Sequence, residues 1–266
     1  MDTAIDFGVV ARPLLFVGLA ALAFLPLERI AAARAPRRRR FAADLAFATV
    51  GQVLVRIGIV VVVGAALARL DGLALDRPLF HGIGDPRARR LAEIAVGLLL
   101  FELGGYAYHR LAHGVPALWR LHEVHHSSET MDWLASFRQH PLEILLLTLA
   151  QNAPLVLLGV PLGAHATVLV VLKLATVYVH SNLRVPLGPL RFVVATPRFH
   201  HRHHRRDGAP ANFAALFPFL DVVLGSYDGA DAGAARFGVA RPLPDSFVGL
   251  LLAPLRRGDR ARRGSS

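Results

Sequence analysis

Residues 91–126 read LAEIAVGLLLFELGGYAYHRLAHGVPALWRLHEVHH, an apolar run that leads directly into two groups of histidines. The apolar part, Leu91 to Tyr108, contains only two charged residues, Glu93 and Glu102. A helix needs about 17–25 predominantly apolar residues to cross a bilayer, and this run is long enough. The stretch therefore predicts a membrane-spanning helix that ends in histidines.

Four further apolar stretches of similar length occur along the chain. They run Phe7 to Leu27, Leu45 to Ala68, Ile144 to Val160 and Leu162 to Val179. Because lipid offers the backbone no hydrogen-bond partners, such stretches are expected to be helical. We therefore predict an all-α integral membrane protein with four or five transmembrane helices and a cytoplasmic, helical, histidine-rich cap.

The composition agrees with a membrane protein. Hydrophobic residues make up 54% of the 266 residues and charged residues only 18%, and the mean hydropathy is +0.44. A soluble domain needs more surface charge, and a disordered chain has fewer apolar residues, so both classes are excluded. The net charge of +11 resides in basic residues that flank the apolar runs. This pattern indicates a membrane and no nucleic-acid partner.

The basic residues also predict the orientation in the membrane. Arg29, Arg34 and the run Arg37 to Arg40 follow the first apolar stretch. Such an excess marks a cytoplasmic loop, so the N-terminus is expected outside and every histidine group on the cytoplasmic side. The basic loop from Arg69 to Arg90 is an exception. Only one of the 30 basic residues is a lysine, which indicates a GC-rich bacterial genome and hence a bacterial cytoplasmic membrane.

The chain has 13 histidines and no cysteine. The lack of cysteine excludes disulfides, zinc–thiolate sites, iron–sulfur clusters and cysteine nucleophiles. Histidines with metal-ligand spacing form one H-x-x-x-H and two H-x-x-H-H groups, and a single histidine follows the fifth apolar stretch. The nine candidate ligands are His109, His113, His122, His125, His126, His180, His200, His203 and His204.

Helix geometry suggests how these histidines divide. Residues at i and i+4 share one face of a helix, whereas adjacent residues diverge by roughly 100°. One member of His125/His126, and one of His203/His204, could therefore bind one metal while its neighbour binds a second. Nine ligands exceed the four of a tetrahedral site, so we expect two metals with four or five nitrogens each. Imidazole suits Fe, Zn, Cu and Ni alike.

The remaining histidines are expected to have other roles. His81 and His165 have no histidine partners and are assigned to solvent-facing or packing positions. His140 is expected to support a ligand through a hydrogen bond. His201 is expected to point away from its neighbours on a helix.

Three charged residues lie within the apolar stretches: Arg56, Glu102 and Lys173. Charges are costly in hydrocarbon, so they are expected to face the bundle interior or to extend toward the interface. For Glu102, an ion pair with Arg56 or Lys173 and a role in binding substrate both stay open.

Two other functions need to be considered. Residues His122, Glu123 and His126 match H-E-x-x-H, the pattern of a zinc protease in which the glutamate is the base. That interpretation uses two of the nine histidines and leaves the others unexplained. A non-enzymatic metal-binding or transport protein would carry polar ligands along a path through the bilayer, whereas here the histidines gather at one end.

The ordered histidine groups resemble the fatty acid hydroxylase/sterol desaturase superfamily of integral-membrane di-iron oxygenases. The segments Arg138 to Glu143 and His180 to Asn182 are similar to connecting segments of that family. Asn212-Phe213 and Asp221 to Tyr227 resemble its closing signature. The resemblance covers roughly residues 101 to 227. Ala214 stands where the family commonly has glycine, a loop difference that involves no candidate ligand.

The resemblance implies that the nine histidines hold two iron ions, which use O2 as co-substrate to attack a C–H bond of a lipid. Hydroxylation and desaturation both stay open, and so do sterol-like, fatty-acyl, carotenoid and alkylglycerol substrates. The chain has no room for a fused cytochrome, so an external ferredoxin, cytochrome or reductase is expected to donate electrons. Basic residues near the last histidine group are candidates to dock that donor or to contact lipid headgroups: Arg184, Arg191, Arg198, Arg202, Arg205 and Arg206.

These expectations divide the chain into three parts. Residues 1–90 form N-terminal transmembrane helices and loops, and residues 91–230 form a fatty acid hydroxylase-like di-iron domain. Residues 231–266 form a basic C-terminal tail, whose arginine-rich end is expected to lie on anionic lipid.

Overall fold

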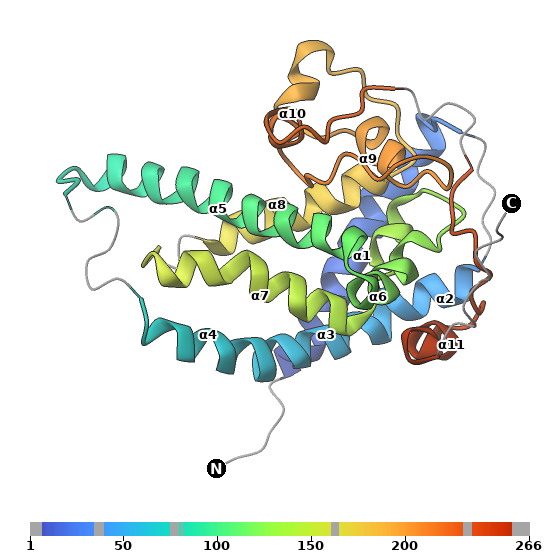
Figure 1. The fold of residues 1–266 in the computed structure, drawn as a ribbon, viewed down its shortest axis with the longest axis horizontal. Coiled ribbons are helices and arrows are strands. Elements are labelled where there is room, and N and C mark those ends of the chain that lie inside the picture. Colours follow the sequence, from blue (N-terminus) through green and yellow to red (C-terminus); the bar gives the residue numbers. More distant parts are fainter. Residues whose placement is uncertain are drawn as a thin grey trace, which may run out of the picture.

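A computed structural model describes residues 7–34, 40–74, 80, 82–160, 165–230 and 236–256. These residues form helices and loops and contain no β-strand, which confirms the all-α class (Figure 1). The longer elements are α1 (Phe7–Ile30), α5 (Pro86–Gly114), α6 (Pro116–His126), α7 (Pro141–Leu157) and α8 (His165–His180). The short helices near the C-terminus are α9 (Pro197–His203), α10 (Phe219–Val223) and α11 (Phe247–Leu252). The 3-10 turns are η3 (Trp133–Phe137), η5 (Gly188–Phe192) and η6 (Ala253–Leu255).

The second apolar stretch forms one continuous helix with two π-helical turns. Its parts are α2 (Phe41–Ala46), η1 (Phe47–Gly51), α3 (Gln52–Gly58), η2 (Ile59–Val63) and α4 (Gly64–Asp71). Together with α1 and α5, it gives three helices that are long and apolar enough to cross a membrane. The chain is therefore a membrane protein. Helices α7 and α8 have 17 and 16 residues, slightly fewer than the roughly 20 that a spanning helix needs. The number of four or five spans stays a prediction.

Helix α5 is longer than its apolar run predicts, because local signals set its ends. The Asp85 side chain accepts a hydrogen bond from the Ala88 amide at 2.7 Å, and Pro86 occupies the first turn. Val115 precedes a proline and adopts an extended conformation, which ends the helix. His109 and His113 therefore lie in the last two turns of the same helix that contains the apolar run.

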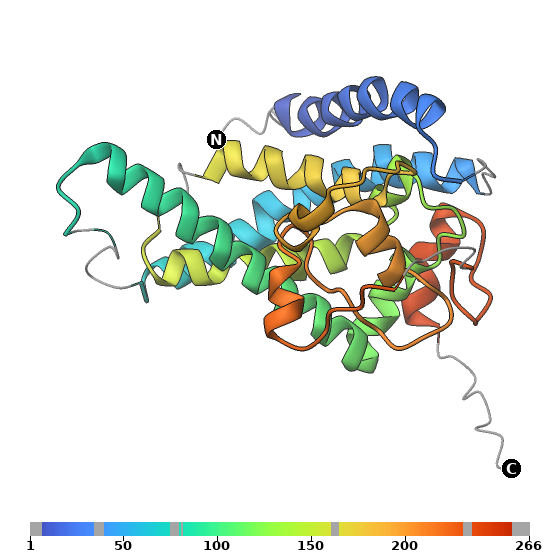
Figure 2. The ribbon, with the colours of Figure 1, turned by 90° about the horizontal axis from the view of Figure 1, so that it is seen from above.

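The long helices lie side by side, and the histidine-bearing elements gather at one end. Helix α7 packs between α5 on one side and α3 and α4 on the other (Figure 1). Helix α1 packs across α3 and α8 (Figure 2). Helices α6, α9 and α10 lie toward the end of the bundle where α5 and α8 terminate. This end forms the cap, whose cytoplasmic location stays a prediction.

Residues 236–256 fold onto this cap. Leu250 of α11 is fully buried and packs in one cluster with Phe47 and Val124, from the second long helix and from α6. The folded part of the C-terminal region thus contributes to the core, whereas residues 257–266 lie outside the described part. The division at residues 90 and 230 stays a prediction.

Helices α5 and α7 approach closely where α5 has two consecutive glycines. A Cβ added at Gly104 would clash with the Ala150 carbonyl oxygen, and one at Gly105 would lie 3.0 Å from the side-chain Nε2 of Gln151. Small residues that let backbones approach are typical of helix contacts in membranes. This contact sets the distance between α5 and α7, both of which carry residues of the histidine site described below.

The Gly104→Ala variant is expected to be less stable, because the clash is with backbone that a side-chain rotation cannot relieve. Overpacking typically costs about 1–3 kcal/mol. Thermal unfolding in detergent should show a lower midpoint than the wild-type protein. Gly18→Ala in α1 is the matched control, since nothing lies within 4 Å of its added Cβ. Equal midpoints for the two variants would contradict the close packing.

Candidate metal centre

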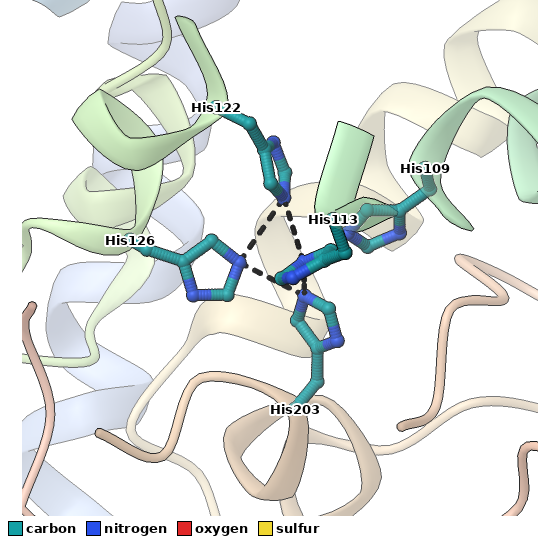
Figure 3. A group of neighbouring side chains, drawn as sticks. All are labelled: His109, His113, His122, His126 and His203. Atoms are coloured by element: carbon teal, nitrogen blue, oxygen red, sulfur yellow. Dashed lines mark hydrogen bonds between the residues drawn. The ribbon is translucent and has the colours of Figure 1, made fainter. Parts of the chain in front are cut away.

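Five imidazoles from three helices converge in a first group, which Figure 3 shows in close-up. His109 and His113 come from α5, His122 and His126 from α6, and His203 from α9. Four Nε2 atoms form a closed ring. The distances are 3.1 Å from His113 to His122, 3.1 Å from His122 to His126, 3.0 Å from His126 to His203 and 3.3 Å from His203 to His113. The His109 ring lies beside this ring of atoms, with centroids 4.4 Å from His203 and 4.8 Å from His122.

Four further imidazoles form a second group: His125, His180, His200 and His204. Their Nε2 atoms follow one another at 3.1 Å from His125 to His180, 3.0 Å from His180 to His200 and 3.0 Å from His200 to His204. His180 is the last residue of α8, so this group joins the end of an apolar helix to α6 and α9. All four residues are buried.

The structure thus brings together all nine predicted histidines, in groups of five and four. Each adjacent pair is divided between the groups, as helix geometry predicted. His126 and His203 belong to the first group, whereas His125 and His204 belong to the second. Helices α6 and α9 each contribute to both groups. That the nine imidazoles bind metal stays a proposal, which is taken up below.

Most of these imidazoles are fixed through their second ring nitrogen. Nδ1 of His109 donates to the Phe213 carbonyl oxygen (2.7 Å), and Nδ1 of His125 donates to that of Arg138 (3.1 Å). In the same way, Nδ1 of His180 donates to the Thr176 carbonyl oxygen (2.7 Å) and Nδ1 of His203 to that of Ala211 (2.7 Å). Nδ1 of His122 donates to Oε1 of Glu143. With the proton held on Nδ1, the Nε2 atom of each ring presents a lone pair. Partners of this kind orient imidazole ligands in metal sites.

The convergence of these lone pairs tests whether metal ions fit. His125 and His180 both donate through Nδ1, so no proton is left between their Nε2 atoms, which nevertheless lie 3.1 Å apart. Two facing lone pairs repel each other unless a cation lies between them. The Nε2 atom of His109 is also buried without a hydrogen-bond partner. The donor set therefore fits a metal ion in each group.

Burial keeps the cap histidines neutral. It lowers the pKa of His122, His125 and His126 well below the ordinary value, and that of His200, His203 and His204 likewise. Neighbouring imidazoles add to the shift, because a second positive charge nearby is unfavourable. Neutral imidazole is the form that binds metal, so the site is ready to accept one at neutral pH.

Two buried carboxylates hold the loop that supports the first group. Asp221 accepts hydrogen bonds from the amides of Phe213 (2.8 Å) and Ala214 (2.9 Å). Oε1 of Glu102 accepts from the three following amides, those of Ala215, Leu216 and Phe217, at 2.7, 2.6 and 3.2 Å. Because the loop is fixed at both positions, its Ala211 and Phe213 carbonyls face His203 and His109.

Asn212 lets the loop turn between these two carbonyls. It adopts a left-handed conformation with φ of 59°, which asparagine tolerates better than most residues. Its amide group donates to the carbonyls of Phe199 (3.1 Å) and Asp228 (2.9 Å). The sequence segments that resemble the family's closing signature thus act as supports for the histidines.

Glu102 therefore binds the loop backbone instead of pairing with Arg56 or Lys173. The Lys173 ammonium group lies 5.6 Å from the centre of the Phe16 ring.

The histidines that were not candidate ligands lie elsewhere. His140 caps α7 by accepting from the Leu142 amide, and its ring contacts the Leu251 carbonyl at 3.1 Å. It is in neither group. His81 and the side chain of His165 lie outside the described part.

His201 points away from both groups, as the sequence predicted. Its ring contacts the Arg34 guanidinium at 2.7 Å and the His180 carbonyl at 3.2 Å. Burial, followed by the charge of Arg34, lowers the pKa of His201 to about 3. The neutral ring therefore connects the segment after α1 to the end of α8.

Sequence reasoning did not assign three residues that contact the histidines. Glu143 accepts a hydrogen bond from Nδ1 of His122. In the sequence it was visible only as an acidic residue in the first turn of an apolar helix. The Trp119 ring lies 5.1 Å from His113 and 5.5 Å from His126 between centroids. The buried Arg138 guanidinium donates to the Asp44 carboxylate at 2.5 Å. This contact fixes Arg138, whose backbone carbonyl accepts from His125. The partners come from distant parts of the chain, so no local pattern indicates them.

The geometry argues against the zinc protease. Both oxygens of Glu123, the would-be base, contact Arg241, at 2.5 and 3.4 Å. Glu123 belongs to neither histidine group. His122 and His126 share their group with three further imidazoles, which a protease site of that type does not use.

Comparisons with known proteins agree with this site. The family model described as "Fatty acid hydroxylase" matches residues 94–226, half of the chain, and this region contains all nine histidines. The ornithine lipid hydroxylase OlsE of Rhizobium tropici is 29% identical over 171 residues, which cover 63% of this chain and 52% of that protein. The alkylglycerol monooxygenase of Homo sapiens is 30% identical over 144 residues, 53% of this chain and 32% of that protein.

The alkylglycerol monooxygenase of Danio rerio is 29% identical over the same length. No solved structure matches the chain. The chain spans about a third to a half of the length of these relatives. Since the family model covers half of the chain and every residue of both histidine groups, the chain belongs to the fatty acid hydroxylase family.

Proposed function

We propose that this protein is a membrane-bound di-iron oxygenase that hydroxylates a C–H bond of a membrane lipid, with O2 as co-substrate and electrons from a separate donor. One observation carries the proposal: nine imidazoles present convergent Nε2 atoms in two adjacent groups at the end of a bundle of apolar helices. The relatives named for ornithine lipid and alkylglycerol support a lipid substrate.

The geometry favours a metal with six-coordinate preference over tetrahedral zinc. Nitrogens bonded at about 2.1 Å stand about 3.0 Å apart when neighbouring bonds are perpendicular, and about 3.4 Å apart in a tetrahedron. Three of the four ring distances in the first group, 3.0, 3.1 and 3.1 Å, are closer to the first value, and the fourth, 3.3 Å, is closer to the second. Five candidate ligands also exceed a tetrahedral set. Imidazole suits iron, and iron supplies the redox chemistry with O2 that cleavage of an unactivated C–H bond requires.

Hydroxylation is the reaction we favour over desaturation, because the relatives' names describe a hydroxylase and a monooxygenase. In this proposal His109, His113, His122, His126 and His203 hold one iron, and the four histidines of the second group hold the other. Nδ1 partners keep five of these rings, those of His109, His122, His125, His180 and His203, in the metal-binding tautomer. Sterol-like, fatty-acyl, carotenoid and alkylglycerol lipids stay within the proposed substrate class.

The two groups differ in their access to the surface. The second group is buried throughout, whereas His109 and His113 of the first are partly exposed. Trp119 is also partly exposed and contacts His113. We therefore infer that the lipid chain reaches the first group, while the second is shielded from water by α8 and α9.

The electron donor is proposed to dock near the last histidine group. Arg198 and Arg206 are exposed there, and Arg205 is partly exposed. Arg202 pairs with Asp228 and is less available. A ferredoxin, cytochrome or reductase with an acidic face would complement the exposed arginines, which favours fast association.

The proposal is tested on detergent-purified protein made in iron-supplied cells. Metal analysis is expected to find two irons per chain, because the two groups each fit one ion. Addition of membrane lipid extract, O2 and a chemical reductant should yield a hydroxylated lipid with consumption of O2, measured by an oxygen electrode and mass spectrometry.

Omission of the lipid extract is the control for uncoupled O2 uptake. One zinc per chain with no iron and no O2 consumption would contradict the oxygenase. An unsaturated product in place of a hydroxylated one would keep the iron site but reject hydroxylation.

A further inference from the structure

Two segments of the cap expose an apolar surface although neither belongs to a membrane-spanning helix. The first comprises residues 184–194 and includes η5, and the second comprises residues 219–224 and includes α10. We call them together the apolar shelf. Its exposed side chains include Leu190, Phe192, Val193, Val222, Val223 and Leu224, with Val223 76% and Leu190 60% exposed. Exposed apolar patches on a protein surface mark contact with a membrane or another protein.

The two segments form one surface because they are joined at their ends. The Phe192 ring lies 5.5 Å from the Tyr227 ring between centroids, and the Tyr227 amide donates to the Asp221 carbonyl of α10 at 3.1 Å. The Ala195 amide, directly after the first segment, donates to the Leu216 carbonyl at 2.8 Å. Both segments are thus attached to the loop that supports His109 and His203.

Contacts with α5 place the shelf at the depth of the last turns of a membrane helix. The Leu216 amide donates to Glu102, and the Arg110 guanidinium donates to the Leu224 carbonyl at 3.3 Å. Glu102 and Arg110 are eight residues apart, or about 12 Å along a helix. Both lie within Pro86–Gly114, which is long and apolar enough to cross a membrane. Figures 1 and 2 both show α10 near the later part of α5.

Basic residues accompany the apolar side chains. Arg184 and Arg191 are exposed in the first segment, and the Arg191 guanidinium lies 4.9 Å from the centre of the Phe192 ring. An arginine beside apolar side chains can keep its charge at the level of lipid phosphates while its neighbours enter the acyl region. This combination is typical of helices that lie in a membrane interface.

We propose that the apolar shelf is inserted into the headgroup–acyl boundary of the leaflet on the histidine side, so that lipid, and not another protein, covers it. The shelf then fixes the depth of the first histidine group, because Phe213 of the attached loop holds His109. Arg184 and Arg191 contact lipid phosphates and are not part of the donor surface. The proposal does not depend on the oxygenase activity.

The cysteine-free chain allows a direct test with single labels. The variants Leu190→Cys and Val223→Cys carry a nitroxide label, and the full chain is reconstituted at low density in vesicles of phosphatidylcholine and phosphatidylglycerol. Asp207→Cys is the control, since Asp207 lies in the exposed polar loop 206–210 with its side chain 59% exposed. Power saturation compares collisions with apolar O2 and with a water-soluble nickel chelate.

Labels at positions 190 and 223 are expected to collide more with O2 than with the nickel chelate, and the label at position 207 is expected to show the reverse. Nickel accessibility at positions 190 and 223 equal to that at position 207 would overturn the proposal. Low accessibility to both reagents would also overturn it, because a second copy or a protein partner would then cover the shelf. If one labelled variant fails to fold by gel filtration, the other position decides.

Discussion

The His122→Ala/His126→Ala variant is expected to lose the metal of the first histidine group and to keep the metal of the second. It removes two of five convergent nitrogens from one group and none from the other. The complementary His200→Ala/His204→Ala variant removes two of four nitrogens from the second group. Each variant should bind one iron per chain where the wild-type protein binds two, and the combination of all four substitutions should bind none. Metal analysis of the purified proteins gives these numbers directly.

Turnover should fall in both variants by more than the 10–100-fold that loss of an outer hydrogen-bond partner typically costs, because here the ligands themselves are removed. The control is His140→Asn, which retains a side chain able to cap α7 and lies outside both groups. It should keep two irons. If His122→Ala/His126→Ala loses both metals, the nine imidazoles form one coupled centre, and the division into two groups is wrong.

Replacing Glu143 by glutamine is expected to weaken the first metal site alone. The carboxylate of Glu143 is 2% exposed and accepts the Nδ1 proton of His122. A charged partner of this kind orients the ring and raises its basicity, and its loss typically costs about 10–100-fold in metal affinity. Glutamine preserves the size of the side chain, so the change isolates the charge.

The two double variants provide backgrounds in which this effect can be assigned to one site. In the His200→Ala/His204→Ala background only the first group holds metal, and Glu143→Gln should make a competing chelator remove it at 10–100-fold lower concentration. In the His122→Ala/His126→Ala background the same substitution should change nothing. Glu93→Gln is a control, because Glu93 lies 16 residues before His109, or about 24 Å along α5. An equal effect in both backgrounds would show that Glu143 acts through overall stability.

The architecture and the division of the adjacent histidines between two groups were largely predictable, because both depend on short-range periodicity. Length and apolar content indicated membrane helices, and the described residues include three of sufficient length. The i, i+4 spacing of His122 and His126 places both on one helix face, and adjacent histidines must diverge. These relations are fixed once the helix forms, so the division of His125 from His126 could be stated before any tertiary contact was known.

The supports of the site could not be predicted in this way. The Glu143 carboxylate is 21 residues from His122, and Glu102 binds amides more than a hundred residues away. The sequence left Glu102 between an ion pair and a substrate role, and the structure shows it binding backbone amides of the 215–217 segment. A buried carboxylate can be satisfied by any nearby amide or cation, so composition does not select the partner.

The sequence by itself determined that the chain is helical, enters a membrane and carries nine histidines in four local sets, since these properties follow from hydrophobicity and helix periodicity. Only the tertiary structure decided that His109, His113 and His203 join one group while His180 joins the other. Membership depends on where α5, α6, α8 and α9 meet. That meeting point is set by long-range packing, including the glycines that let α5 approach α7 and the carboxylates that fix the 211–217 loop. Such contacts link residues far apart in the chain and leave no periodic signal in it.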